Sequence, residues 1–435
     1  MPRESSPVHQ PKDGRNATRR ELSIAFLSVI IHALVVAASL VPGWRADPLV
    51  NGDAVSYLVP AQTILATGHF SRETGPEPRW DPTRTPGYPL VLAASLALTG
   101  GMAAALFLSC MTAGLAAWSA ARLAVEWGGG AAEAWMAGAM VAILPNSLGL
   151  SARLLTDAMF AHLFLFWLFL TWRGLRTGHL LALAGSGSTC VALQMLKPTF
   201  NLAPLLIVLV AATAGCLWTR GRTVALLLLI SLATPLYFAS RMLRDHGVFS
   251  PSLLGTEAVR EYLQVRALAA KESVGEEEMQ RRVRAADWAA VGRLTSPESE
   301  YGRLHLVKKA AVRAFVFAHP MRTLWLMTME AIKQFLAPQE FAFEIFLGEL
   351  PVPARAAGSV LTLAIWALAA AGAWTLWKRG LPGAPLLVAG IFVVVLGAGS
   401  ISHWVGGRLR LPADVAAAPL FGAGAARLLL ARRLV

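Results

Sequence analysis

Apolar residues in this chain occur in continuous blocks of about 20 residues, separated by shorter polar stretches. A block of this length lets an α-helix cross the hydrocarbon core of a membrane, which is about 30 Å thick. The blocks do not alternate between apolar and polar residues, so they predict helices and not membrane strands. We therefore expect an all-α polytopic membrane protein. Ten spans are predicted, at residues 22–43, 101–122, 132–149, 156–173, 179–196, 199–218, 223–240, 356–377, 382–401 and 411–431.

Composition strengthens the membrane prediction. Hydrophobic residues make up 55% of the 435 residues and charged residues only 15%, with a mean hydropathy of +0.53. The net charge of +13 would suggest nucleic acid for a soluble chain. Basic residues at the ends of spans instead orient a membrane protein and contact anionic lipid, so we predict lipids and no nucleic acid as partners.

Cys110, Cys190 and Cys216 lie inside apolar blocks without metal-ligand spacing, and we interpret them as packing residues.

Short basic connections predict the orientation of the spans. Residues 1–21 are polar and rich in Pro, Ser and Arg, so we expect a cytoplasmic tail followed by an uncleaved first span. With the tail inside, alternate connections lie inside and carry the basic residues that the positive-inside rule requires. These residues are Arg122, Arg173, Arg176, Arg220, Arg222, Lys378, Arg379, Arg432 and Arg433. The predicted location is the inner or cell membrane of a bacterium.

This orientation requires that residues 321–346 do not cross the membrane. Glu330 and Lys333 lie in the middle of this run, so we predict an amphipathic helix in the outer interface, followed by a turn. If the segment did span, all later connections would change sides, and Lys378 and Arg379 would lie outside.

Two long segments are expected on the outer side. The first is a loop at 44–100, in which Pro86–Leu98 is too short to span and is predicted to form a juxtamembrane helix. The second is a helical region near 241–320 with thirteen Lys or Arg and ten Asp or Glu residues. Its mixed charges fit either a solvated helical face or a role in acceptor binding. The predicted divisions are the tail, a transmembrane module at 22–240, the outer helical region at 241–354 and a second transmembrane module at 355–435.

Six charged residues are predicted at the outer ends of spans, on four separate connections. They are Asp53, Arg84, Asp157, Lys197, Arg408 and Arg410. Charges close to membrane depth are costly, which makes them candidates for a functional site. Basic residues on the outer side also break the positive-inside rule, and this suggests an anionic ligand there.

The types of these residues suggest transfer from a phosphate-linked donor. The planar guanidinium of arginine donates two parallel hydrogen bonds and is suited to phosphate. A carboxylate beside such a group can act as a general base on an acceptor, while the cations neutralise the leaving phosphate. Because the site lies at the membrane, we expect a lipid-linked donor.

Two of the candidate acids also have a purely structural interpretation. Asp53 could cap a helix at 54–67, since aspartate is a favoured capping residue. Asp157 could cap the span that follows it or pair with Arg153. Both alternatives stay open from the sequence.

The same holds for the remaining candidates. Lys197 could extend from the end of a span to the interface, and Arg408 and Arg410 could contact lipid headgroups. The run Pro86-Gly87-Tyr88-Pro89 could be only a rigid turn. His403 could line the site, since it lies close to Arg408 in the sequence.

There is no Walker A sequence, Rossmann fingerprint, HExxH motif or metal-ligand constellation, so we predict transfer without a metal or other cofactor.

The order of motifs resembles that of a known family. The first outer loop reads Gly52-Asp53-x-x-x-Tyr57-x-x-x-Ala61-x-x-x-Leu65-x-x-Gly68-x-Phe70, then Arg84-Thr-Pro-Gly-Tyr-Pro-Leu90. The later motifs are Thr156-Asp157-Ala-Met-Phe160, Leu196-Lys197-Pro198-Thr199 and Arg408-Leu-Arg410-Leu-Pro412. Together they resemble the GT-C membrane glycosyltransferases, and are most similar to the bacterial branch related to protein O-mannosyltransferases and the lipid A aminoarabinose transferase.

The resemblance implies inverting transfer of a monosaccharide from a polyprenyl-phosphate donor to a glycan, lipid or protein acceptor on the outer face. Asp53 would be the catalytic base and Asp157 would help to position a substrate. The phosphate contacts would be Arg84, Lys197, Arg408 and Arg410, and the substrate pocket would include Tyr57, Tyr88 and His403.

The sequence departs from the family pattern in places. The eukaryotic mannosyltransferases have an Asp-Glu pair in the first loop, whereas Asp53 follows Gly52 and stands alone. Leu409 replaces the tyrosine of the last motif, and Gly406-Gly407 replaces the acid before it. The sugar and the acceptor therefore stay open. A lipid-carrier flippase or other transporter, and a non-catalytic scaffold with the same fold, are the alternative functions.

Overall fold

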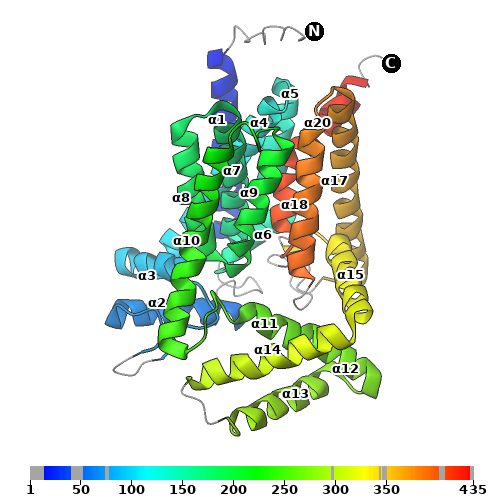
Figure 1. Cartoon of the computed structure of the whole chain (residues 1–435). Coiled ribbons are helices and arrows are strands. Elements are labelled where there is room, and N and C mark those ends of the chain that lie inside the picture. Colours follow the sequence, from blue (N-terminus) through cyan, green and yellow to red (C-terminus); the bar gives the residue numbers. More distant parts are fainter. Residues whose placement is uncertain are drawn as a thin grey trace.

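A computed structural model describes residues 14–40, 52–73, 78–294, 298–341, 344, 350–400 and 407–431. In these residues every regular element is a helix, which confirms the all-α class. The long helices stand side by side in one bundle, while α2, α3 and α11 to α14 lie across its lower end (Figure 1). The helix α1 begins, and α20 ends, at the upper end of the bundle.

Five of the described helices are long and apolar enough to cross a membrane. They are α1 (Gly14–Ser39), α4 (Ala103–Glu126), α7 (Thr156–Thr177), α10 (Gly221–His246) and α17 (Val352–Lys378). The helices α5 (Ala131–Ile143) and α6 (Pro145–Ser151) meet at 47° and together make a sixth candidate. The bend comes at Leu144, whose extended backbone precedes Pro145, and proline cannot continue the hydrogen bonds of the preceding helix.

Four more apolar helices of the bundle are shorter than a full span. They are α8 (Leu180–Leu196), α9 (Ala203–Thr213) with the preceding turn η1 (Pro198–Leu202), α18 (Gly383–Gly399) and α20 (Ala418–Ala431). Each of the ten predicted spans therefore coincides with an apolar helix or helix pair. By length and composition five or six of them qualify as spans, and the total of ten stays a prediction.

Small residues bring the helices of the bundle close together. A Cβ atom on Gly372 of α17 would lie 1.8 Å from the carbonyl oxygen of Leu420 on α20. A Cβ atom on Gly114 of α4 would lie 2.4 Å from a methyl group of Val29 on α1. Such contacts let backbones approach in a membrane, where lipid offers no hydrophobic drive between helices. The three cysteines are buried and unpaired.

Two helices of the first outer loop lie across the lower end of the bundle. The helix α2 (Gly52–Thr67) is followed by α3 (Gly87–Thr99), which coincides with the predicted juxtamembrane helix. Gly100 ends α3 in a left-handed conformation with a φ of 68°, which glycine adopts without steric cost.

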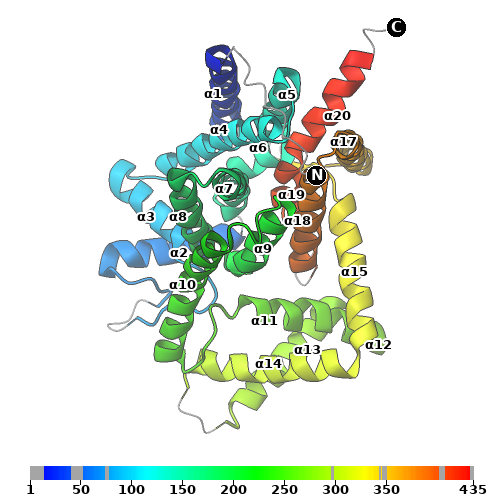
Figure 2. The same ribbon diagram turned by 45° about the horizontal axis from the view of Figure 1, so that its top comes forward.

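The outer helical region forms a layer below the bundle, and Figure 2 shows α11 to α14 apart from it. It consists of α11 (Leu254–Ala258), the π-helical turn η2 (Val259–Gln264), α12 (Val265–Glu272), α13 (Glu276–Val291) and α14 (Glu300–Ala318). Many of its mixed charges pair within the region, as in Arg260–Asp287 at 2.6 Å and Arg284–Glu261 at 2.6 Å. These ion pairs contribute to packing within the region, and both interpretations of its charges stay open.

The helix α15 (Pro320–Leu336) connects this layer to the bundle. Glu330 and Gln334 are buried on one side of α15, whereas Met321, Trp325 and Ile332 are exposed on the other. It is therefore amphipathic, as expected for the first part of 321–346, and it is not among the candidate spans. Its place in the membrane interface stays a prediction.

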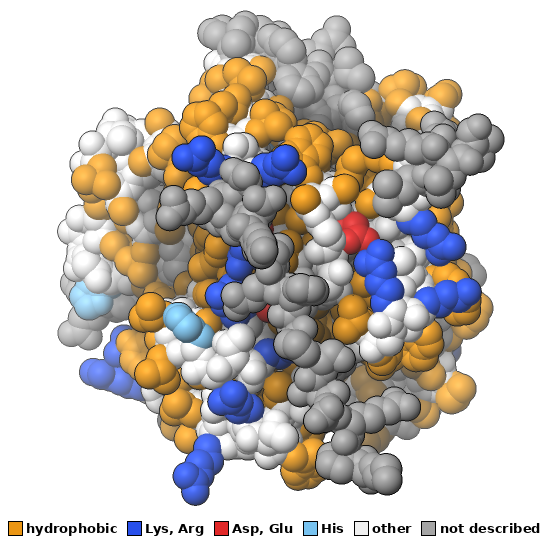
Figure 3. All heavy atoms as spheres, turned by 90° about the horizontal axis from the view of Figure 1, so that it is seen from above, with side chains coloured by type: hydrophobic (Ala, Val, Ile, Leu, Met, Phe, Trp, Pro, Cys, Tyr) orange, Lys and Arg blue, Asp and Glu red, His pale blue; other side chains and the backbone are white. Residues whose placement is uncertain are grey.

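The upper face of the bundle is basic. Seen from above, its described part shows Lys and Arg side chains among hydrophobic ones and few acidic ones (Figure 3). Ion pairs such as Arg122–Glu21 at 3.1 Å and Arg379–Glu133 at 2.9 Å lie at this end. A basic face of this kind fits the predicted cytoplasmic side.

Candidate functional site

Five of the six predicted charged residues meet at the lower end of the bundle. We call them the charged cluster: Asp53, Arg84, Asp157, Lys197 and Arg408. Arg408 bridges the two acids, with its Nη1 atom 2.6 Å from Asp53 Oδ2 and its Nε atom 2.6 Å from Asp157 Oδ2. Arg84 Nη2 donates to Asp53 Oδ1 at 2.9 Å, and Lys197 Nζ pairs with Asp157 Oδ1.

Helix ends bring these side chains together. Asp53 and Asp157 lie in the first turns of α2 and α7, where the helix dipole favours negative charge. Lys197 ends α8 in an extended conformation, which the following Pro198 favours. Arg84 precedes α3, and Arg408 lies between α18 and α19 (Leu411–Ala416).

The alternative pairing of Asp157 with Arg153 is not observed. Arg153 Nη2 instead lies 2.8 Å from Glu344 Oε2, while both carboxylate oxygens of Asp157 bond the cluster cations. Asp157 is therefore held by residues of two distant connections and not by its near neighbour in the sequence, Arg153.

Tyrosines line one side of the cluster. Arg84 Nη1 donates to Tyr57 Oη at 3.2 Å, and Tyr57 Oη lies 3.4 Å from Thr156 Oγ1. The rings of Tyr57 and Tyr88 pack edge to face with centroids 5.3 Å apart. Both tyrosines were predicted in the substrate pocket. His403 was predicted there too, and it lies outside the described residues.

The two acids differ in their access to solvent. The side chain of Asp53 is 40% exposed, whereas that of Asp157 is 1% exposed. Asp53 is therefore open to solvent at the lower end of the bundle, whereas Asp157 is enclosed and bonds Arg408 and Lys197.

The charges of the cluster fix its protonation. Burial acts to raise the pKa of Asp53, but Arg408 and Arg84 outweigh it and hold the pKa below its usual value. Burial acts in the opposite sense on Arg408, but Asp157 and Asp53 raise its pKa. Burial lowers the pKa of Lys197 despite its pairing with Asp157. Three cations against two carboxylates give the cluster a net positive charge, which suits an anion.

Arg410 does not take part in the charged cluster. Its side chain is fully buried, its Nε atom pairs with Asp414 at 3.0 Å, and its Nη1 atom donates to three backbone carbonyls. These partners lie away from the cluster, so the geometry gives it no route to a ligand there.

The charge of Asp53 also acts on Tyr262, a residue that the sequence analysis did not single out. It lies on the π-helical turn η2. Burial is the largest cause that raises the pKa of Tyr262, and the negative charges of Glu261 and Asp53 raise it further. Leu253 N donates to Pro82 O at 3.0 Å, which attaches the start of the outer helical region beside Arg84. No motif in the sequence separates Tyr262 from the other two tyrosines outside the first loop, Tyr237 and Tyr301.

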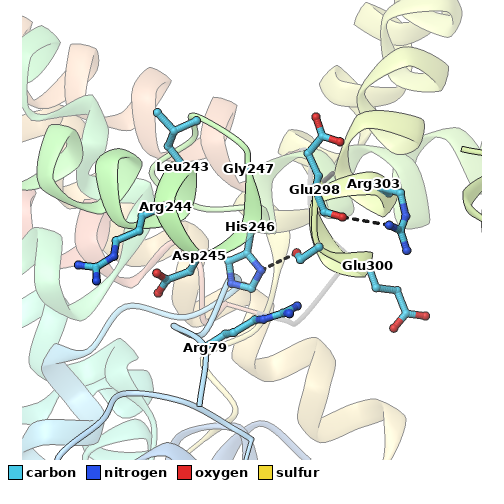
Figure 4. A pocket seen from close by; sticks show the side chains of 10 residues that line it. Arg79, Leu243, Arg244, Asp245, His246, Gly247, Glu298, Glu300 and Arg303 are labelled. Carbon is cyan, nitrogen blue, oxygen red and sulfur yellow. Dashed lines mark hydrogen bonds between the residues drawn. The ribbon is translucent and has the colours of Figure 1, made fainter. Parts of the chain in front are cut away.

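A cavity of about 450 Å³ lies where α10, α14 and the first outer loop meet, and Figure 4 shows its lining. His246 joins its walls, bonding Ser299 Oγ at 2.8 Å and Trp80 O at 2.7 Å. Charges of both signs surround it, among them Arg79, Arg244 and Glu300. No residue of the charged cluster lines it, so this cavity is separate from the candidate site.

Among the described residues, no group of three or more His, Cys, Asp or Glu side chains is arranged to hold a metal ion. The carboxylates of Asp53 and Asp157 bond cationic side chains. Transfer without a metal stays a prediction.

Comparisons with known proteins identify the fold. No protein-family model matches the chain, and no curated protein matches it. Two structures of the oligosaccharyltransferase AglB from Archaeoglobus fulgidus align with 95% of the chain, at 14% identity and TM-scores of 0.51 and 0.53. One contains an inhibitory peptide and a dolichol-phosphate, and the other a tethered acceptor peptide. The chain has the GT-C fold.

The GT-C likeness is one of architecture. The chain spans about half the length of AglB, covering 51% and 50% of the two structures. ArnT from Cupriavidus metallidurans is also similar, at 15% identity and a TM-score of 0.37, with 92% of this chain and 77% of ArnT covered. The GT-C fold is that of polytopic helical membrane proteins, in agreement with the apolar helices of the bundle.

Proposed function

We propose that the chain is a membrane glycosyltransferase that moves a monosaccharide from a polyprenyl-phosphate donor to an acceptor on the outer face. The observation that carries the proposal is the bridge from Arg408 to both Asp53 and Asp157, which joins three distant connections. The dolichol-phosphate bound to AglB, which has the same fold, supports a lipid-phosphate ligand.

The proposed reaction uses the charged cluster in two roles. Asp53 takes the proton of an acceptor hydroxyl, whose oxygen attacks the anomeric carbon of the sugar from the side opposite the phosphate. The bond between that carbon and the phosphate oxygen breaks, and its electron pair stays on the leaving polyprenyl phosphate. Arg408, Lys197 and Arg84 stabilise the negative charge of this phosphate.

Donor binding is expected to activate the base. Without donor, Asp53 is paired with two guanidinium groups, which lowers its pKa and makes it a weak base. A phosphate that bonds Arg408 competes with Asp53 for the same donors. The carboxylate then loses part of its stabilisation, and its pKa rises toward the range in which it accepts a proton more readily.

This competition predicts a difference between two pH profiles. A base must be deprotonated, so activity should fall as the pH drops through the pKa of Asp53. The profile of kcat/KM reports the free enzyme and that of kcat reports the donor complex. We expect the acidic limb of kcat to lie at higher pH than that of kcat/KM. Coincident acidic limbs would contradict the competition between phosphate and Asp53.

The function itself is tested in the cell envelope. Deletion of the gene should remove one monosaccharide from an envelope glycan, lipid or protein, detected as a loss of mass in mass spectrometry. The wild-type gene should restore it, and purified protein should transfer that sugar from its polyprenyl-phosphate form. An unchanged set of envelope glycans, with movement of the lipid carrier across vesicles, would instead favour a flippase.

A further inference from the structure

Arg410 and Arg408 lie two residues apart and have different surroundings. Arg408 reaches the two acids of the charged cluster, while Arg410 is among the largest fully buried side chains of the described part of the chain. A buried guanidinium is costly unless its donors are satisfied. Its partners therefore show what the residue does.

One side of Arg410 caps a helix. Its Nη1 atom donates to the carbonyl oxygens of Gln334 at 2.8 Å, Phe335 at 2.6 Å and Ala337 at 2.9 Å. These carbonyls end α15, where the last turn of a helix has no intrahelical partners, and a cation there is favoured by the dipole. Arg410 thus fixes the end of α15 next to the turn that carries Arg408.

The other side of Arg410 is held by a buried carboxylate. Its Nε atom lies 3.0 Å from Asp414 Oδ1, and Asp414 also accepts from Trp366 Nε1 at 3.1 Å and from Gln339 Nε2 at 3.0 Å. Asp414 has no exposed surface. The pair therefore joins α19, α17 and the segment after α15 in one network.

The turn itself is tightly enclosed. A Cβ atom on Gly407 would lie 2.2 Å from the Nδ2 atom of Asn146 and 3.1 Å from Pro338 O. The backbone N–H of Asn146 in turn donates to Gln339 Oε1 at 3.2 Å, which links the α5–α6 bend to the same network. The backbone on either side of Arg408 is thus fixed by Gly407 and Arg410.

We propose that Arg410 is a positioning residue of the charged cluster. By capping α15 and pairing with Asp414, it fixes the turn that presents Arg408 to Asp53 and Asp157. The inference rests on the proposed function, because it assigns Arg410 an effect on phosphate binding that passes through Arg408.

A double-mutant cycle tests this route. Purified full-length wild type, Arg408→Lys, Arg410→Lys and the double variant are titrated with polyprenyl phosphate in detergent micelles, and the dissociation constants are measured. Arg410→Lys keeps the charge beside Asp414 but loses the three-carbonyl cap. We expect it to weaken binding about tenfold, the size of one hydrogen bond to a charged group. The double variant should bind no more weakly than Arg408→Lys alone, because Arg410 acts through Arg408.

The control is Arg122→Lys, which changes an arginine paired with Glu21 at the opposite end of the bundle and should bind like wild type. Unchanged binding by Arg410→Lys, or losses that multiply in the double variant, would overturn the positioning role. If wild type does not bind polyprenyl phosphate, the proposed function fails and the inference fails with it. Binding by wild type that Arg408→Lys leaves unchanged would also overturn the inference.

A milder variant serves if Arg410→Lys shows no cooperative unfolding. Trp366→Phe removes one hydrogen bond to Asp414 and keeps an aromatic ring against Phe392, whose centroid lies 4.7 Å away. We expect a smaller loss of binding, again absent when Arg408 is already lysine. Wild-type binding by a folded Trp366→Phe protein would overturn the coupling through Asp414.

Discussion

Replacement of Asp53 by asparagine is expected to abolish sugar transfer and leave the protein folded. The amide has nearly the same shape but cannot take a proton from the acceptor. A general base contributes about a hundred- to ten-thousandfold to a rate, and we expect a loss in this range or larger in kcat. Because the side chain is 40% exposed and Arg408 keeps its bond to Asp157, the fold should tolerate the change.

The measurement is transfer from a polyprenyl-phosphate sugar by purified variants, together with their thermal unfolding. Glu278→Gln is the matched control, since Glu278 is also an acid paired with two arginines, Arg281 and Arg282, but it lies on α13 outside the cluster. It should retain wild-type activity. Activity of Asp53→Asn within about tenfold of wild type, below what a lost base must cost, would remove Asp53 as the base.

The bundle could be predicted because its signal is local. An apolar block of span length is visible without knowledge of its neighbours, and each predicted span coincides with an apolar helix or helix pair. The shortness of α18 could not be predicted in the same way. Whether an apolar helix ends early depends on the residues that meet its last turn, and for α18 these include Gln334, which donates to Gly399 O at 2.7 Å.

The charged cluster could be predicted in part. Alternate connections of a bundle lie on the same side, so Asp53, Asp157 and Lys197 could be placed together before their distances were known. The roles of Arg408 and Arg410 could not be separated. Their spacing is that of two equivalent phosphate contacts, and the carbonyls that bind Arg410 are 73 to 76 residues away in the sequence. Only the fold separates them, because Arg408 bonds the two acids of the charged cluster and Arg410 is buried against the end of α15.

Arg408→Ala is expected to have the second large effect, on donor affinity more than on stability. Removal of a buried cation usually leaves an unpaired charge and is strongly destabilising. Here each acid keeps a partner, since Lys197 still pairs with Asp157 and Arg84 with Asp53. The cluster becomes neutral, with two cations and two carboxylates, and loses its attraction for an anion.

The loss of donor affinity should be about ten- to a hundredfold, the size of a hydrogen bond between charged groups. It is measured as the dissociation constant of polyprenyl phosphate, with Arg122→Ala as a control at the opposite end of the bundle. The affinity of the wild-type protein for polyprenyl phosphate should also fall as the salt concentration rises, because the net positive charge of the cluster attracts the phosphate and salt screens this attraction. The salt dependence should be weaker in Arg408→Ala. If Arg408→Ala binds polyprenyl phosphate as tightly as wild type, the phosphate does not contact Arg408. The bridge between the two acids would then serve the fold alone, and the sugar-transfer proposal would lose its main support.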